Sequence, residues 1–408
     1  MTTLITPFRG LRPAPQHAAD VAAPPYDVLN TAEARERAAG RPFSFLHISK
    51  PDIDLPEGTD PYSDAVYEKG AENLRALIDQ GVLLRDTEPC YYVYRLTMGA
   101  HTQTGLVCAA SVADYDSNRI RKHEFTRPTK EDDRVRQITA LNAQTGPVLL
   151  AYRASETVRE ILAGTAQQAA LYDVTADDGI RHELWQLADA ADIDSITASF
   201  DAMPALYIAD GHHRSAAASR VAAKRKDDQA ASRYFLCVAF PDDEMQILDY
   251  NRVVRDLNGK TVRAVLEEIN DAFTVSPESS PAKPGAPGQF GMYLDGQWYR
   301  LTVDPERIPA NDPVASLDVS LLQDHLLAPI LGIGDPRTDE RIDFVGGIRG
   351  LGELERRVDS GEMAAGFALY PTSMEALMAV ADANEVMPPK STWFEPKLAD
   401  GLVSHVLD

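Results

Sequence analysis

The stretch YIADGHHRSAAASR, residues 207–220, constrains the fold most, because it predicts a strand that turns directly into a helix. Apolar and aromatic residues end at Asp210, and a run of alanines follows Arg214. His212, His213 and Arg214 therefore fall in the first turn of the helix. A helix N-terminus already carries about half a positive charge, so a helix opened only for stability favours acidic residues there. The reversed charge predicts a site for an anion.

Two interpretations of this turn compete. In the first, Asp210 is an N-cap that accepts a hydrogen bond from the amide of His212 or His213, worth about 1 kcal/mol. That interpretation leaves the basic residues unexplained. In the second, Gly211 lets the backbone approach a ligand closely, and amides, imidazoles and the Arg214 guanidinium converge on a phosphate. We favour the second and expect Gly211 to Arg214 to bind phosphate.

A second basic cluster occupies RIRKHEFTRPTKEDDR, residues 119–134, in a chain whose formal net charge is −22. We expect Arg127, Lys130 and Arg134 to line the same phosphate pocket. Glu124 stands alone among cations, which would keep it ionised and able to act as a base or hold a metal. A solvated loop balanced by local acids is the alternative.

Three further features have structural and functional interpretations. Thr129 is expected to cap the helix that follows it, because acidic residues come next. His182 and Glu183, in RHELWQL, are equally well explained as ligands or as polar residues of an edge strand. Tyr26 and Asp27, in PPYDVL, belong to a loop that two prolines make rigid.

The sequence lacks the motifs that identify several classes of protein. There is no Walker loop, no dinucleotide fingerprint and no nucleophile elbow. Cys90, Cys108 and Cys237 are too widely spaced for a zinc ribbon or a disulfide framework, and the last two are expected to be buried. The acidic charge disfavours nucleic acid and anionic membranes as partners. With no signal-peptide pattern and no apolar run of about 18 residues, we expect a cytoplasmic protein.

The pattern of elements predicts an α+β fold without a regular βαβ rhythm. Hairpins are expected across Gly99–Gly105 and at Asp295-Gly296. The 408 residues exceed the roughly 250–300 that usually share one core. We therefore expect two regions, one at 1–255 that contains the phosphate turn and an α/β region of unassigned role at 256–408. The Pro-, Gly- and Ser-rich stretch 276–288 is expected to be an insertion or a connection between domains.

Six segments together resemble a known family: PFRGLRP, VAAPPYDVL, KHEFTRPTKEDDR, ALNAQTGPVLLAY, YIADGHHRSAAA and MPPKSTWFEPK. The family is the bacterial and archaeal domain-of-unknown-function family ten-fifteen, and the resemblance spans nearly the whole chain. The DGHHR turn is also similar to the nucleotide- and phosphate-binding turn of the ParB/sulfiredoxin-like superfamily, which includes free-serine kinases. The resemblance implies a ParB/sulfiredoxin-like core with an additional mixed α/β region.

The resemblance also implies an activity. It implies a kinase that uses Mg²⁺ and ATP or ADP to phosphorylate a small hydroxylated metabolite, first of all free L-serine to O-phosphoserine. The segment from Asp210 to Arg214 would hold the nucleotide phosphates, and Asp210 would also act in catalysis and bind the metal. Either Glu124, our first choice, or Glu183 would deprotonate the hydroxyl. The residues expected to contact the substrate are Tyr26, Asp27, His123 and Thr126.

Two functions of other classes remain open: a regulatory protein that binds nucleotide without transfer, and a phosphate-ester hydrolase that uses the histidine pair. A sulfiredoxin-type reaction would need a cysteine beside the turn, whereas Cys237 lies in an apolar strand. Product analysis separates these functions, because they give phosphoserine, no turnover or free phosphate. The donor, the acceptor and the oligomeric state stay open at this point.

Overall fold

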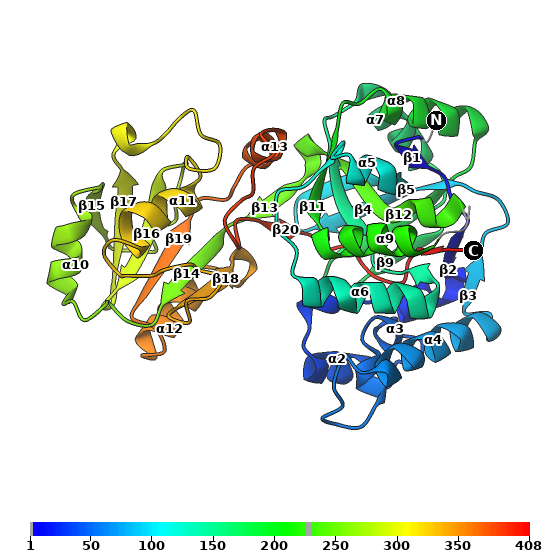
Figure 1. Ribbon diagram of the computed structural model, residues 1–408, viewed down its shortest axis with the longest axis horizontal. Coiled ribbons are helices and arrows are strands. Elements are labelled where there is room, and N and C mark those ends of the chain that lie inside the picture. The colour runs from blue at the N-terminus through cyan, green and yellow to red at the C-terminus, as the bar shows by residue number, and fades with distance from the viewer. Residues whose placement is uncertain (1–2, 226–229) are drawn as a thin grey trace. The chain divides into compact units, whose positions relative to one another are not determined.

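The computed structural model describes residues 3–225 and 230–408 and divides the chain into two compact units. Unit 1 comprises Met1–Met245 and Pro396–Asp408, and unit 2 comprises Gln246–Glu395 (Figure 1). The sequence placed the division at 255 and 256 and contained no sign that the last residues return to unit 1. That return depends on strand pairing between segments far apart in the chain.

Unit 1 is built on a nine-stranded mixed sheet with the order β6-β11-β8-β12-β5-β4-β10-β9, and β1 pairs with β5. The expected hairpin of β4 and β5 is confirmed, with Gly99 in its turn. Cys108 and Cys237 face each other on β5 and β12 and, within the described residues, both are buried and free, as expected. The strands are β1 (Ile5–Thr6), β4 (Tyr91–Met98), β5 (His101–Ser111), β6 (Ile120–Arg121), β8 (Val148–Tyr152), β9 (Tyr172–Thr175), β10 (Arg181–Leu187), β11 (Leu206–Asp210) and β12 (Tyr234–Pro241).

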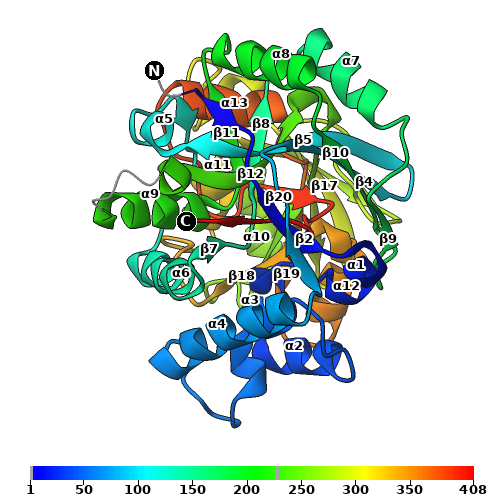
Figure 2. The same ribbon diagram turned by 90° about the vertical axis from the view of Figure 1, so that its right-hand side faces the viewer.

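Helices cover this sheet and share its core. Apolar side chains of α7, α8 and α9 join those of the central strands in one buried cluster. Helix α6 lies beside α9 in both views, and Val135 and Ile138 of α6 pack on Ala217 and Val221 of α9 (Figure 1, Figure 2). The basic stretch that leads into α6 is thereby brought to the start of α9. The bounds are α5 (Val112–Asp116), α6 (Pro128–Leu141), α7 (Glu156–Thr165), α8 (Ala190–Asp201) and α9 (His212–Lys224).

The N-terminal helices form a second core in unit 1 with a small four-stranded sheet of order β3-β2-β21-β7. The C-terminal strand β21 pairs with both β2 and β7, and these pairs hold the end of the chain in unit 1. The elements are α1 (Ala18–Val21), α2 (Thr31–Ala38), α3 (Leu46–Ser49), α4 (Asp64–Asp79), β2 (Gly10–Pro13), β3 (Leu83–Arg85), β7 (Ala143–Gln144) and β21 (Ser404–Val406).

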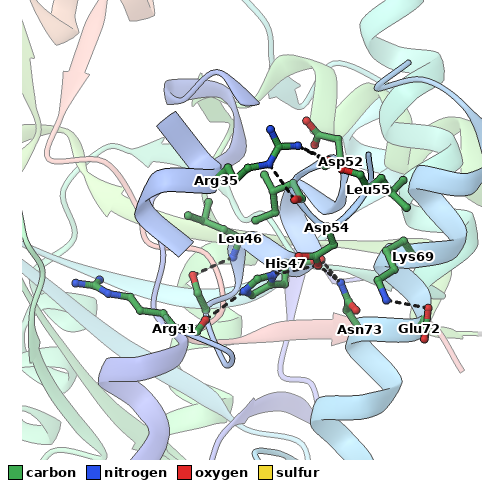
Figure 3. A network of polar contacts seen from close by, with 12 residues as sticks. Arg35, Arg41, Leu46, His47, Asp52, Asp54, Leu55, Lys69, Glu72 and Asn73 are labelled. Atoms are coloured by element: carbon green, nitrogen blue, oxygen red, sulfur yellow. Dashed lines mark hydrogen bonds and ion pairs between the residues drawn. The ribbon is translucent and has the colours of Figure 1, made fainter. Parts of the chain in front are cut away.

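A network of polar contacts ties these N-terminal helices together (Figure 3). His47 lies between the carboxylate of Asp54, at 2.8 Å, and the carbonyl oxygen of Arg41, at 3.2 Å. The amide of Asn73 donates to the carbonyl of His47 at 2.7 Å and to Asp54 at 2.8 Å. Side chains from α3, α4 and the short helix Pro51–Asp54 are therefore connected through one histidine.

Unit 2 contains an antiparallel six-stranded sheet with the order β15-β17-β16-β19-β14-β18. The expected hairpin at Asp295-Gly296 is confirmed, since both residues have positive φ, 50° and 75°. The stretch 276–288 begins in the edge strand β15 and ends before β16, so it does not connect the two units. The elements are β13 (Gln246–Leu248), β14 (Tyr250–Val254), α10 (Val262–Ile269), β15 (Phe273–Glu278), β16 (Gln289–Leu294), β17 (Gln297–Val303), α11 (Asp318–Leu322), β18 (Ile342–Gly346), α12 (Gly352–Asp359), β19 (Ala365–Leu369), α13 (Met374–Asp382) and β20 (Trp393–Glu395).

The fold is thus mixed α and β with several separate sheets, as the irregular succession of elements predicted. Within the described residues, no helix is both long enough and apolar enough to cross a membrane.

Candidate functional site

The turn between β11 and α9 has the geometry of a close backbone approach. β11 ends at Asp210, α9 begins at His212, and Gly211 between them is left-handed, with φ 97° and ψ 28°. Gly211 is the N-cap residue, so the interpretation of Asp210 as an N-cap is wrong. A Cβ on Gly211 would lie 3.1 Å from the Arg214 Nε and 3.3 Å from the Val148 Cα, so both conformation and space call for glycine. All residues of α9 are described, and none in its first turn is acidic.

Asp210 is an ionised carboxylate held by two cations. Its Oδ2 lies 3.5 Å from the Lys397 Nζ and 3.7 Å from the Arg214 Nη2. Burial alone would raise the pKa of Asp210, but the attraction of Lys397 and Arg214 outweighs it and holds that pKa well below its usual range. Arg214 also lies 3.9 Å from the Asp27 Oδ2 and donates to the carbonyl of Pro147. Arg214 therefore has a fixed position between the turn and its surroundings.

His212 and His123 form a buried pair beside the turn. Their ring centroids are 4.5 Å apart at an interplanar angle of 89°, and the amide of His123 donates to the His212 Nε2 at 3.4 Å. Burial lowers the pKa of His212 well below its usual range and that of His123 to about 4. The His123 Nδ1 has no hydrogen-bond partner among the described residues. Glu124 adds a half-exposed carboxylate whose Oε2 is 3.7 Å from the His212 Nδ1.

His213 links the turn to the start of α6. Its Nε2 accepts a hydrogen bond from the backbone amide of Arg127 at 3.0 Å, and burial lowers the pKa of His213. The hydroxyl of Thr126 donates to the carboxylate of Glu131 in the first turn of α6. The segment Thr126–Arg127 therefore lies at the turn, and Arg127 contacts it through its backbone.

Helix α6 begins earlier than its acidic residues suggested. Pro128 occupies its first position and Arg127 is the N-cap, so Thr129 lies inside the helix and the expected capping role of Thr129 is wrong. Proline favours the first helical position because its fixed φ suits the helix and its missing N–H has no partner to lose.

Several cations of the basic stretch 119–134 contact backbone carbonyls or tyrosine side chains of the protein. Arg119 donates to the backbone carbonyls of Asp201 and Met203 at 2.8 and 2.9 Å. The Lys122 ammonium lies 3.9 Å from the ring centre of Tyr115, and the Lys130 ammonium donates to the Tyr62 hydroxyl. Counting cations in the sequence therefore overstates how many of them surround the turn, although the charge of Lys130 is close enough to His213 to act on its pKa.

A pocket lies directly beneath the turn in unit 1. It is partly open to solvent, and polar and apolar side chains line it together. Arg214 belongs to both the turn and the pocket. The residues that line the pocket are Tyr26, Ser49, Arg134, Gln137, Ile138, Gln144, Thr145, Gly146, Val148, Arg214, Phe235, Leu236 and Asp400.

The pocket encloses both signs of charge. The Arg134 guanidinium lies 3.9 Å from the ring centre of Tyr26 and donates to Asp133 at 2.8 Å. Asp400 is 1% exposed, and burial raises its pKa to about 7 although Arg214 acts to lower it. Burial also raises the pKa of Tyr26 to about 12. The Tyr26–Asp27 loop thus lies against the pocket and the turn, where sequence analysis expected a binding role for it.

Lys397 and Asp400 were not among the site residues expected from the sequence. Both belong to the segment that returns to unit 1, and Asp400 exchanges backbone hydrogen bonds with Ala23. The only sequence signal was the end of MPPKSTWFEPK, which contains Lys397.

Glu183 lies away from this site. β10, which carries it, is separated from β11 by β8, β12, β5 and β4, and strands are about 4.8 Å apart. The Glu183 carboxylate pairs with Arg181 at 3.1 Å, and the His182 Nδ1 bonds with the Tyr94 hydroxyl at 2.7 Å. The structure therefore does not bring Glu183 to the turn, and RHELWQL contributes polar residues to a strand.

Metal binding at the turn would involve few protein ligands. Within residues 3–225 and 230–408, no group of three or more His, Cys, Asp or Glu side chains is arranged to hold a metal. Mg²⁺ that arrives with substrate phosphates takes only one or two protein carboxylates. The ionised carboxylate of Asp210 fits that chemistry.

The structure defines a mixed α/β protein in which a left-handed glycine and three basic residues begin a helix. The model of the family described as "Protein of unknown function (DUF1015)" matches residues 5–320, and the chain belongs to this family. Lys397 and Asp400 lie beyond the matched residues. Among curated proteins, none matches the chain.

Solved structures give low similarity. The chain is similar to a free serine kinase in complex with AMP, with 13% identity, 73% of this chain and 92% of that chain covered, and a TM-score of 0.35. It is also similar to a conserved hypothetical protein from Pyrococcus furiosus, with 14% identity, coverage of 72% and 93%, and a TM-score of 0.35. SbnI with a C-terminal truncation from Staphylococcus aureus has 11% identity, coverage of 72% and 85%, and a TM-score of 0.33.

Proposed function

We propose that the protein is a nucleotide-dependent phosphotransferase that transfers a phosphoryl group from ATP or ADP to the hydroxyl of a small metabolite, with free L-serine as the first acceptor. A ParB/sulfiredoxin-like core around β11 and α9 is part of this proposal. The observation that carries it is the turn itself: left-handed Gly211 followed by His212, His213 and Arg214 at the start of α9. The first N–H groups of a helix have no intrahelical acceptor, and they bind phosphate well.

Each group at the turn then has a distinct role. The backbone of Gly211 and His212 faces the transferred phosphate, and the Arg214 guanidinium neutralises its charge. Arg127 and Lys130, at the start of α6, extend the cationic surface around the nucleotide. Mg²⁺, when bound with the nucleotide, would neutralise further phosphate charge, and Asp210 is the residue that would hold it.

Glu124 is the proposed base. Its carboxylate is half exposed and lies beside His212, so a hydroxyl could approach it from solvent. The acceptor's proton passes to Glu124 as the acceptor oxygen forms a bond to phosphorus. The bridging P–O bond of the donor breaks, and its electron pair stays on the phosphate oxygen of the departing nucleotide. Such a transfer needs positioned charges and a proton acceptor, with little other chemistry from the protein.

The test combines the full chain with Mg²⁺, ATP or ADP, and a pool of amino acids and hydroxy acids, followed by mass analysis of the products. O-phosphoserine is the expected product. Free phosphate without a phosphorylated acceptor would instead identify a hydrolase, and nucleotide binding without turnover would identify a regulatory protein. Glu183→Gln is the matched control for Glu124→Gln, because Glu183 lies on a distant strand of the same sheet.

A further inference from the structure

The pocket beneath the turn contains buried polar atoms that lack partners. The Ser49 Oγ and the Asp400 Oδ1 form no hydrogen bond with any described residue, and these residues are only 5% and 1% exposed. Both residues line the same pocket. Buried polar atoms in folded proteins are nearly always hydrogen-bonded to protein or to ordered water, so two such atoms in one pocket mark a place where a bound molecule would find partners.

The charges around the pocket describe that ligand. A guanidinium has five N–H donors, and the pair with Asp133 uses those on the Nε and Nη2 of Arg134. Arg134 can therefore also receive a carboxylate. Asp400 offers a carboxylate oxygen to a cation, with Arg134 and Arg214 close enough to influence its ionisation. A small molecule that carries a carboxylate and an ammonium group complements Arg134 with the first and Asp400 with the second.

Gly146 and the apolar residues that line the pocket also bear on the kind of ligand. A Cβ on Gly146 would lie 3.4 Å from the Arg214 Cδ and 3.6 Å from the Asp400 Oδ1, so the glycine leaves this corner open. Val148, Phe235 and Leu236 supply apolar lining. Apolar walls exclude water and strengthen the attraction between opposite charges. A compact head group is favoured over a long chain.

We propose that this pocket binds the head group of a free α-amino acid, its carboxylate at Arg134 and its ammonium at Asp400. The proposal rests on the proposed function, because the bound amino acid would present its side-chain hydroxyl toward Arg214 and the turn. Asp400 then determines specificity, and the C-terminal segment that returns to unit 1 completes the acceptor site.

Calorimetric titration of the full chain without nucleotide tests the assignment. The probes are L-serine, L-glycerate, which has a hydroxyl in place of the ammonium at the same configuration, and L-serinamide, which lacks the carboxylate. We expect the wild-type protein to bind L-serine at least tenfold more tightly than either analogue. Asp400→Asn should weaken L-serine binding at least tenfold and leave L-glycerate binding unchanged.

The matched control is Asp318→Asn in unit 2. Asp318 also has an unpartnered buried oxygen among the described residues and a pKa raised by burial, to about 6. Its replacement should leave L-serine binding unchanged. If Asp400→Asn does not fold, Ser49→Ala, which removes the other unpartnered atom, should weaken L-serine binding. Equal binding of L-serine and L-glycerate by the wild type, no binding of L-serine, or unchanged L-serine binding by the folded Asp400 and Ser49 variants would overturn the proposal.

The two proposals fail in different ways. If a phosphorylated product forms only from acceptors that are not amino acids, the phosphotransferase stands and the pocket assignment falls. If L-serine binds through Asp400 and no phosphoryl transfer occurs with any donor, the pocket assignment stands and the phosphotransferase falls.

Discussion

Unit 1 contains two polar clusters that differ in how completely their groups are paired. In the network of Figure 3, both ring nitrogens of His47 have partners, and the Asp54 carboxylate bonds with His47 and Asn73. The hydrogen bond to Asp54 raises the pKa of His47 and, despite partial burial, lowers that of Asp54. Each partner thus favours the charged form of the other.

The turn and its pocket show the opposite pattern. Burial lowers the pKa of His123 to about 4 and raises that of Asp400 to about 7, and each has a side-chain atom without a partner among the described residues. Burial disfavours the charged forms of the His123 imidazole and the Asp400 carboxyl. Full pairing therefore stabilises the fold, whereas the unpartnered atoms of Ser49 and Asp400, which line one pocket, support the proposed ligand site. A lone unpartnered oxygen such as that of Asp318 does not.

The largest expected effect is on turnover. Glu124→Gln should lower the rate of phosphoryl transfer at least about a hundredfold, since a general base contributes roughly 10²–10⁴-fold, while nucleotide binding is retained. Steady-state rates and nucleotide titrations of the variant measure both quantities. Normal turnover would leave Glu124 as a charge-balancing residue, and Glu183→Gln should behave as the wild type in either case.

The next effect is on nucleotide affinity. Arg214→Ala should weaken nucleotide binding by about 1.5–3 kcal/mol, the range for a hydrogen bond to a charged group. Calorimetry on the folded variant checks this, with Arg181→Ala as a control because Arg181 pairs with Asp173 on a distant strand pair. An unchanged affinity would remove the turn from the nucleotide site.

The third prediction concerns the effect of Asp400→Asn on the free energy of unfolding. The pKa of Asp400 is about 7 in the folded state and about 4 when unfolded, so its ionisation favours unfolding as pH rises through that window. Removing the carboxyl should therefore stabilise the protein by about 1–3 kcal/mol at pH 8 and have little effect at pH 4. Thermal unfolding at both values measures this. A variant less stable at pH 8 than the wild type would show that Asp400 serves the fold.

The smallest expected effect lies in the paired network. The raised pKa of His47 contributes stability below about pH 6.5 that is lost as pH rises, and the lowered pKa of Asp54 contributes stability above about pH 4 that is lost on acidification. Asp54→Asn should therefore destabilise the protein by about 0.5–1.5 kcal/mol at pH 5 and by less at pH 8. Unfolding curves at these values provide the check, and activity should not change. A loss of activity without a loss of stability would contradict the structural role.

Local chemistry in the sequence predicted the start of the site. An apolar run, a glycine and a run of alanines specify β11, Gly211 and α9, because strand, turn and helix propensities act over neighbouring residues. The basic residues after Gly211 follow the same rule, since a helix N-terminus disfavours them unless an anion is present. The two prolines before Tyr26 and Asp27 predicted a rigid loop, and the family resemblance added its expected role in binding.

Which charged side chains lie close together depends on the tertiary structure. Strand pairing of β21 with β2 and β7 brings Lys397 and Asp400 to residues almost two hundred positions earlier, and no local pattern encodes such a contact. The order of strands separates Glu183, the second candidate base in the sequence, from the turn. Burial, which sets the pKa of Asp400, depends on every element around the pocket. Propensity and periodicity are properties of neighbouring residues, whereas desolvation and long-range pairing are properties of the folded chain.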